Sequence, residues 1–139
     1  MCDFADLASA KGKPAGVEVG AEVNLLSEVP EQGHQLVIDQ PILRNPQLEK
    51  LRQVSHEIFA AATLDITWPI EGGPEGIEKR LDALCAEAAD QVQHGANILI
   101  LSDRNLGPER VAMPSLLAVA AVHHHLVREG TRLRTGLVI

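Results

Sequence analysis

The sequence is very poor in aromatic residues, because Phe4, Phe59 and Trp68 make up only 2% of 139 residues and tyrosine is absent. This scarcity excludes an aromatic platform on which single-stranded nucleic acid could stack. Positive charge is also scarce, since 12 Lys and Arg oppose 19 Asp and Glu and give a formal net charge of −7. Contacts to a phosphate backbone need clustered Lys and Arg. We therefore expect no nucleic-acid partner and an aliphatic core.

The two cysteines, Cys2 and Cys85, are too few for a disulfide framework or a cysteine-rich metal site. The first residues are acidic and lack the apolar core of a signal peptide. The longest apolar run, Leu116–Val122, is too short to span a bilayer. These features predict a soluble, cytoplasmic protein with no membrane contact.

Residues 1–33 are predicted to form an irregular N-terminal arm. Two segments rich in glycine and proline, at 11–16 and 29–33, break regular structure there. The apolar residues between them suit an extended segment. The remainder, 34–139, has the size of one ordinary domain.

The first part of this domain contains two candidate strands and a helix. Leu36–Ile38 is short and apolar, so a strand or an extended segment fits. Asn45, followed by proline, suits the N-cap of a helix. Ile58–Trp68 is predicted to be a strand that leaves the sheet near Asp65, although its Ala60–Ala62 stretch also allows a helix.

The second part alternates helices and strands. A glycine-rich turn leads to a helix over 74–93, in which apolar residues recur at i, i+3, i+4 and i+7. Ala96–Leu101 is then a continuous apolar run, which is typical of a strand covered on both faces. A loop, a helix over 114–129 and a last strand over Leu133–Ile139 follow. A glycine stands after each helix, where a positive φ can end it.

This order predicts an α/β fold with a parallel β-sheet flanked by helices, strand–helix–strand–helix–strand (βαβαβ). The predicted sheet has few strands, and its last strand has no helix after it. We therefore expect an incomplete piece of a larger domain. Uncovered parallel strands expose apolar faces and edge hydrogen-bonding groups, which predicts self-association through the sheet edge.

Three polar residues follow the predicted central strand: Ser102, Asp103 and Arg104. Ligands of open α/β sheets bind outside the carboxyl ends of strands. A serine can donate, an aspartate can accept, and an arginine can clamp a carboxylate or phosphate. These residues are our candidates for ligand contact or an interface. The alternative is that they cap the loop and pair with neighbouring elements.

His123, His124 and His125 are consecutive. On a helix such side chains point about 100° apart, so they cannot converge on one metal ion. Helical metal pairs need i, i+4 spacing. We expect no metal site, with one histidine buried and hydrogen-bonded and the others along a polar seam. The preceding segment, Leu116–Val122, is apolar all round, which predicts burial on most sides.

No catalytic residue is predicted. Cys2 would become N-terminal if Met1 were removed and could then act as a nucleophile with its own amine as the base. Nothing near it in the sequence supplies an oxyanion hole or a substrate pocket. No Ser-His-Asp arrangement and no catalytic carboxylate pair can be placed.

Several short segments, in a fixed order over about Asn24–Ile139, resemble the central domain of the glutamate synthase large chain. They are Asn24-Leu-Leu, Leu43, Leu48-Glu-Lys-Leu51, Ala61-Ala-Thr-Leu-Asp65, Leu84-Cys-Ala-Glu-Ala88, Gly95-Ala-Asn-Ile-Leu-Ile-Leu-Ser-Asp-Arg104 and Pro114-Ser-Leu-Leu-Ala118, followed by the three histidines. The resemblance implies a parent enzyme that makes glutamate from glutamine and 2-oxoglutarate. It also implies ammonia channelling from a glutaminase domain to an FMN barrel, and an iron–sulfur cluster that supplies electrons.

The chain also departs from that family. Cys2 is followed by Asp3 where the family's glutaminase begins Cys-Gly, and the segments that bind FMN and the cluster are missing. We therefore expect a structural connector that is inactive alone and holds no cofactor, with the glutaminase domain and the FMN barrel as partners. One alternative is an autonomous module that binds a small anion at Ser102–Arg104, or another protein. Another is a free-standing enzyme that uses the histidines and Asp103.

Overall fold

The computed structural model describes residues 17–22, 35–54 and 58–139. Its elements in chain order are β1 (Val17–Val19), β2 (Leu36–Ile38), α2 (Asn45–Arg52), β3 (Ala61–Asp65), β4 (Thr67–Pro69), η2 (Ile70–Gly72), α3 (Gly73–Gln93), β5 (Ile98–Ser102), β6 (Arg110–Ala112), α4 (Ser115–Arg128), η3 (Arg132–Arg134) and β7 (Gly136–Val138). The predicted α/β fold with a parallel sheet is confirmed.

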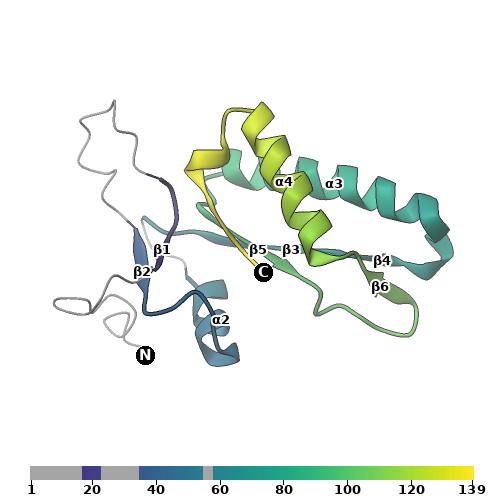
Figure 1. The fold of residues 1–139 in the computed structure, drawn as a ribbon, viewed down its shortest axis with the longest axis horizontal. Helices are drawn as coiled ribbons and strands as arrows, with labels where there is room; N and C mark the ends of the chain where they lie inside the picture. Colours follow the sequence, from purple (N-terminus) through teal and green to yellow (C-terminus); the bar gives the residue numbers. More distant parts are fainter. Residues whose placement is uncertain (1–16, 23–34, 55–57) are drawn as a thin grey trace.

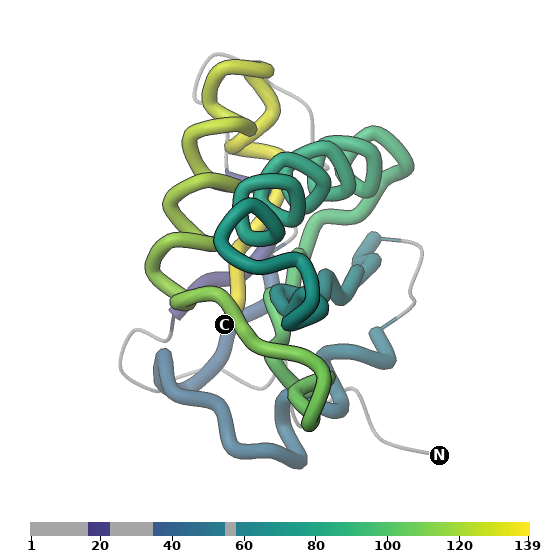
Figure 2. Tube along the Cα trace, turned by 90° about the vertical axis from the view of Figure 1, so that its right-hand side faces the viewer, coloured from purple at the N-terminus to yellow at the C-terminus, as the bar shows by residue number. Residues whose placement is uncertain are grey.

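A three-stranded parallel sheet, in the order β3-β5-β7, forms the centre of the fold. Ala61 lies opposite Ile98 in the first pair of strands, and Ile98 lies opposite Gly136 in the second. Helix α3 connects β3 to β5, and α4 connects β5 to β7. Both helices cover the same face of the sheet, whereas α2 and the β1–β2 pair lie on the other (Figures 1 and 2).

The central strand β5 is buried on both faces, as its continuous apolar run predicts. Leu99 and Leu101 belong to the core under α3 and α4, which includes Leu84, Ala88, Val122 and Leu126. Ile98 and Ile100 belong to a second core, with Leu36, Leu51 and Val54 from the α2 side. Strand β5 therefore contributes side chains to two separate apolar clusters, one on each face of the sheet.

Asn97 holds the entrance to β5 in place. Its side-chain Nδ2 donates to the carbonyl of Ile58 at 2.6 Å, and its Oδ1 accepts from the N–H of Ala60 at 3.0 Å. The carbonyl of Ala60 in turn accepts from the N–H groups of Asn97 and Ile98. The chain before β3 and the chain before β5 are thus joined through one amide side chain.

The segment Val17–Val19, which the sequence placed in an irregular arm, is a strand that pairs antiparallel with β2. Of the two alternatives for Leu36–Ile38, the strand is therefore the one observed. The β1 end approaches β7 closely, because a Cβ on Gly136 would lie 2.8 Å from the backbone nitrogen of Gly20. The rest of the predicted arm, including Cys2, lies outside the described residues.

The predicted strand over Ile58–Trp68 breaks at Asp65, as expected, and the alternative helix at Ala60–Ala62 is wrong. Beyond the break, β4 turns away from the main sheet and pairs antiparallel with β6, a strand that the sequence assigned to a loop. The N–H of Ile66 donates to the carbonyl of Ser102 at 3.0 Å, and its carbonyl accepts from Met113 at 3.0 Å. These bonds carry the chain from one sheet to the next.

Helix bounds agree with prediction to within a residue or two, but three further local predictions are wrong. Asn45 is not the N-cap of α2, since the helix begins there and Gln47 accepts from the N–H of Arg44 at 2.9 Å. The last strand is shorter than predicted because η3 occupies its beginning. Helix α4 buries only one side, which contains Ala118, Val122 and Leu126. Within the described residues, no helix is both long and apolar enough to cross a membrane.

Candidate functional site at the strand ends

Ser102 and Arg104 do lie at the carboxyl end of β5, but both are bound to helix α2. Nη2 of Arg52, in the last turn of α2, donates to Oγ of Ser102 at 2.9 Å. The same hydroxyl accepts from the N–H of Arg104 at 3.3 Å. Nη2 of Arg104 then donates to Oδ1 of Asn45 at 2.8 Å. The polar groups that were candidates for a ligand thus connect a strand end to both ends of a neighbouring helix.

Asp103 is exposed and takes a different role from its neighbours. Its backbone carbonyl accepts from the N–H of Leu106 at 3.0 Å, which tightens the start of the loop after β5. Arg52 is also held from within its own helix, because its Nη1 forms an ion pair with Glu49 at 3.2 Å. The three predicted residues are therefore brought together, with two of them engaged inside the domain.

Asp65, at the end of β3, is the residue of this region that sequence reasoning missed. Its Oδ2 accepts from Nη2 of Arg110 at 2.9 Å and from Nδ2 of Asn105 at 3.0 Å, while Oδ1 accepts from the N–H of Thr67 at 2.8 Å. Burial raises the pKa of Asp65, but the hydrogen bonds from Asn105 and Thr67 and the charge of Arg110 outweigh it. The net pKa lies below its ordinary value.

Arg80, on α3, contacts the same end of β3, at Asp65. Its Nε and Nη2 donate to the backbone carbonyl of Asp65 at 3.1 and 2.6 Å, and its guanidinium holds the carboxylate of Glu87 at 2.6 and 2.8 Å. The hydrogen bond to Glu87 raises the pKa of Arg80 against the opposing effect of burial. Arg110 also donates through Nε to Oγ1 of Thr67 at 2.9 Å. The network joins β3, α3, β4 and β6.

One signal in the sequence could have located Asp65. Parallel strands end at the same edge of a sheet, and Asp65 pairs in register with Ser102. A carboxylate at one strand end and a hydroxyl with an arginine at the next are therefore neighbours by topology. What sequence cannot supply is the partner of each group, because Arg110 comes from the unpredicted strand β6. Chemically, most of these groups bond to one another and fix the loops that follow the strands, although Nε of Arg52 is buried without a hydrogen-bond partner among the described residues.

The three histidines have separate environments on α4. Nδ1 of half-buried His123 accepts from Nε of Arg132 at 3.0 Å, and its ring meets that of His124 edge to face, with centroids 5.1 Å apart. His124 is exposed and His125 is half-buried. In the part of the chain that the structure describes, no group of three or more His, Cys, Asp or Glu could hold a metal ion.

The cysteines do not fit an iron–sulfur cluster, which needs several thiolate ligands. The sequence contains two, and Cys85 is buried in α3. Burial, helped by the charge of Asp82 and opposed by that of Arg128, raises the pKa of the Cys85 thiol. This thiol is a core side chain.

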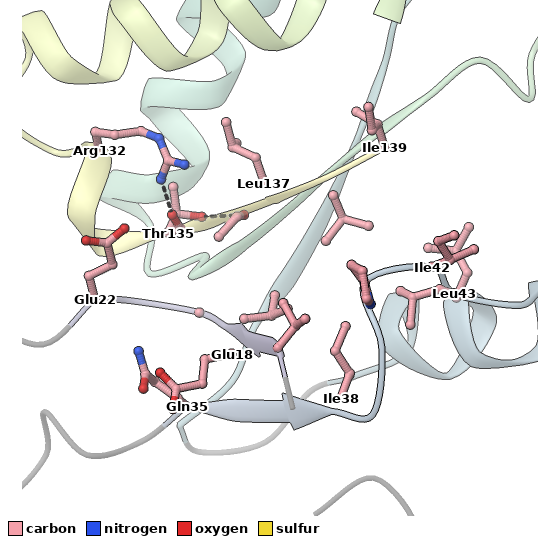
Figure 3. A pocket seen from close by; sticks show the side chains of 17 residues that line it. Glu18, Glu22, Gln35, Ile38, Ile42, Leu43, Arg132, Thr135, Leu137 and Ile139 are labelled. Carbon is pink, nitrogen blue, oxygen red and sulfur yellow. Dashed lines mark hydrogen bonds between the residues drawn. The ribbon is translucent and has the colours of Figure 1, made fainter. Parts of the chain in front are cut away.

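A cavity of about 520 Å³ lies elsewhere, between β1, residues 38–43 and β7 (Figure 3). None of the predicted site residues lines it. Its wall has acidic side chains at one end, Glu18 and Glu22, and apolar ones such as Ile42 and Ile139 at the other.

Comparison with known proteins gives one family. The family model described as the glutamate synthase central domain matches residues 14–139, so the similarity begins before Asn24. The chain is 41% identical over 126 residues to the chloroplastic ferredoxin-dependent glutamate synthase of Spinacia oleracea, covering 88% of this chain and 8% of that protein. It is 37% identical over 114 residues to the NADPH glutamate synthase large chain of Azospirillum brasilense, covering 82% and 7%. Over 123 residues it is 31% identical to the NADH glutamate synthase of Saccharomyces cerevisiae, covering 87% and 6%. The chain thus spans less than a tenth of these relatives.

Proposed function

The chain belongs to the glutamate synthase central domain family, and on this premise we propose that it is a connecting domain of such an enzyme, without an active site of its own. The polar groups at the strand ends support this proposal, because they hold loops and helices of the domain to one another. The candidates that would have suggested a ligand site, Ser102 and Arg104, spend hydrogen bonds on Arg52 and Asn45.

The exposed apolar side of α4 is the observation that carries the proposal. Leu116 is 81% exposed, Leu117 40% and Val127 51%, and α4 lies beside α3 in the layer of helices on one face of the sheet (Figure 1). Leu116 and Val127 are about three turns apart on one side of the helix. An exposed set of large apolar side chains beside a buried stripe is typical of a surface that packs against another protein body. A domain that spans 8% of a relative has such a body available.

The partners would be the remaining parts of a glutamate synthase large chain, namely the glutaminase domain and the FMN barrel. In this proposal the chain keeps these two bodies in the geometry that lets ammonia pass between them. FMN and the iron–sulfur cluster would be held by the rest of the enzyme, since this chain lacks the cysteines for a cluster. The whole would make glutamate from glutamine and 2-oxoglutarate.

A chimera tests the proposal directly. The matching region of the Azospirillum brasilense NADPH large chain is replaced by residues 14–139 of this protein, and glutamate formed is measured per glutamine hydrolysed. We expect coupled glutamate synthesis. Changing Leu116→Glu together with Leu117→Glu should leave glutamine hydrolysis in place while uncoupling it from synthesis. Glu75→Gln together with Glu78→Gln, on the exposed side of α3, is the matched control.

Two outcomes would contradict the proposal. The first is that the isolated 139-residue chain hydrolyses glutamine and loses this activity on Cys2→Ala, because the chain would then contain an active site. The second is that the Leu116 and Leu117 variant of the chimera remains fully coupled, because the exposed side of α4 would then contact no other part of the enzyme.

A further inference from the structure

Strand β7 is an edge strand of the described sheet, and one side of it offers unpaired backbone groups. In a parallel ladder the N–H and C=O of one residue point to the same neighbour, and those of the next residue point the opposite way. The N–H of Gly136 donates toward β5, to the carbonyl of Asn97 at 2.9 Å. The N–H and C=O of Leu137 therefore point away from β5, and no described residue is bonded to them.

The cavity of about 520 Å³ lies beside β7, with β1 and residues 38–43 on its other side, and Leu137 is among the residues that line it (Figure 3). Its apolar end is lined by Ile38, Leu43 and two strongly exposed residues, Ile42 at 77% and Ile139 at 69%. The groove thus combines the unpaired backbone N–H and C=O of Leu137 with a wall of aliphatic side chains. These are the two ingredients of strand addition, in which backbone bonds give affinity and alternate side chains give specificity.

The other end of the groove is acidic. Glu18 on β1 and Glu22 after it both line the wall and are exposed. Arg132 is nearby, but its guanidinium is occupied by Nδ1 of His123 and the carbonyl of Thr135. Within the described residues neither glutamate forms an ion pair. A positively charged side chain at this end of an incoming segment would therefore meet complementary charge.

We propose that the groove beside β7 binds an extended peptide segment from the rest of a glutamate synthase large chain. The segment adds a fourth strand to the sheet and bonds to Leu137. Its apolar side chains contact Ile42 and Ile139, and a Lys or Arg at its other end pairs with Glu18 and Glu22. This inference rests on the proposed function and deepens it, because it gives the connector a second contact surface, separate from α4.

Amide hydrogen exchange of the 139-residue chain tests the inference at single residues. The probe is a short blocked peptide in which Val and Thr alternate and two lysines stand at one end. Bound peptide should slow exchange at Leu137 about tenfold or more. The amide of Gly136 already bonds to β5 and should not change. N-methylation of the peptide amides on the side that faces β7 should abolish binding, whereas N-methylation of the other amides should not.

A charge exchange tests the acidic end. Glu18→Lys together with Glu22→Lys should weaken the lysine peptide about tenfold and favour the same peptide with glutamates in place of lysines. Glu75→Lys together with Glu78→Lys, on the far side of the molecule, is the control and should change neither affinity. Unchanged exchange at Leu137 under saturating peptide, or equal affinity for both peptides, would overturn the inference.

A second copy of the chain is the competing occupant, as the sequence-based prediction of edge association has it. In that case the protection of the Leu137 amide against hydrogen exchange would rise with protein concentration and would not depend on the peptide. This result would also contradict our inference. The proposed function fails differently. If the chimera is coupled but the groove binds no peptide, only the proposal of a peptide-binding groove is contradicted. If the chimera is uncoupled but the peptide still binds, only the proposal of a connecting domain is contradicted.

Discussion

The guanidinium of Arg132 donates through Nε to Nδ1 of His123 at 3.0 Å, and through Nη1 to the carbonyl of Thr135 at 2.6 Å. One side chain thus ties α4 to the residue that precedes β7. The ring nitrogen Nδ1 of His123 is the acceptor of this hydrogen bond. Of the three consecutive histidines, His123 is the one whose side chain forms a hydrogen bond to another described residue.

His123→Ala should lower the free energy of unfolding by about 1–2 kcal/mol, because it leaves a partly buried donor of Arg132 unpaired. His124→Ala, at the exposed neighbouring position, should change it by less than about 0.5 kcal/mol. Urea unfolding followed by circular dichroism measures both. Equal effects of the two changes would show that the bond to Arg132 contributes nothing.

Asp65→Asn should destabilise the protein by about 2 kcal/mol at neutral pH, because it removes the charge that Arg110 contacts. The folded-state pKa of Asp65 lies below its ordinary value of 3.8. Its carboxylate therefore contributes stability that is complete above 3.8 and is lost as the pH falls through the lower folded-state value. The difference between wild type and variant should shrink in acid.

Denaturant midpoints from neutral pH to below 3.8 provide this measurement. Asp103→Asn, at the exposed carboxylate of the neighbouring strand end, is the control. A difference between wild type and Asp65→Asn that stays constant with pH would contradict the assignment.

Gly136→Ala should cost about 1–3 kcal/mol, because its Cβ would lie 2.8 Å from the nitrogen of Gly20 and 3.0 Å from Cγ1 of Val19. The backbone of β1 would have to move away from β7. Gly107→Ala places a Cβ where nothing lies within 4 Å and should be close to neutral. Hydrogen exchange would show which amides lose protection in the Gly136→Ala variant. If the amides of β1 were as protected in the variant as in the wild type, this packing would be disproved.

The strand end should bind no small anion specifically. Titration calorimetry with phosphate, glutamate and 2-oxoglutarate is expected to give no saturable heat, because Ser102 and Arg104 are bonded within the domain. Saturable binding that disappears on Arg104→Ala would support the alternative of an anion-binding module. Arg134→Ala, an exposed arginine of η3, controls for general loss of positive charge.

The isolated chain should self-associate as its concentration rises, since Leu116, Leu117 and Val127 expose a large apolar surface. Leu116→Glu should shift the apparent mass in sedimentation velocity toward the monomer without lowering stability, because that side chain contacts little. Glu75→Gln should have no such effect. A wild-type chain that stays monomeric at high concentration would show that the exposed side of α4 is not adhesive.

Sequence patterns predicted most of the layers of the fold. The apolar run of β5 indicated a strand buried on both sides, and the periodicity of α3 gave its bounds to within a residue. The apolar composition of α4 led to the wrong prediction that the helix is buried on most sides. Composition gives the hydrophobicity of a helix but not which elements pack against it. Leu116 would be buried only if a neighbour were present.

The polar network was harder to predict for a different reason. Strands β4 and β6 have three residues each and show no useful alternation. The bond between Asp65 and Arg110 joins positions 45 residues apart, and it exists only because that short pair is in register. Ser102 and Arg104 were correctly placed at the strand end, but Asn45 was assigned to helix capping and so could not be recognised as a partner.

Strand β5 is apolar on both faces, so hydrophobic burial alone does not determine which of its side chains face which core cluster. Sliding it by one residue would exchange isoleucines for leucines between the two clusters at little hydrophobic cost. The alignment of β5 must then be set by its polar ends, where Asn97 bonds to Ile58 and Ala60 and Ser102 bonds to Arg52. These few hydrogen bonds fix the register of β5. Without them, the strand could occupy more than one register while its side chains stayed buried in apolar surroundings.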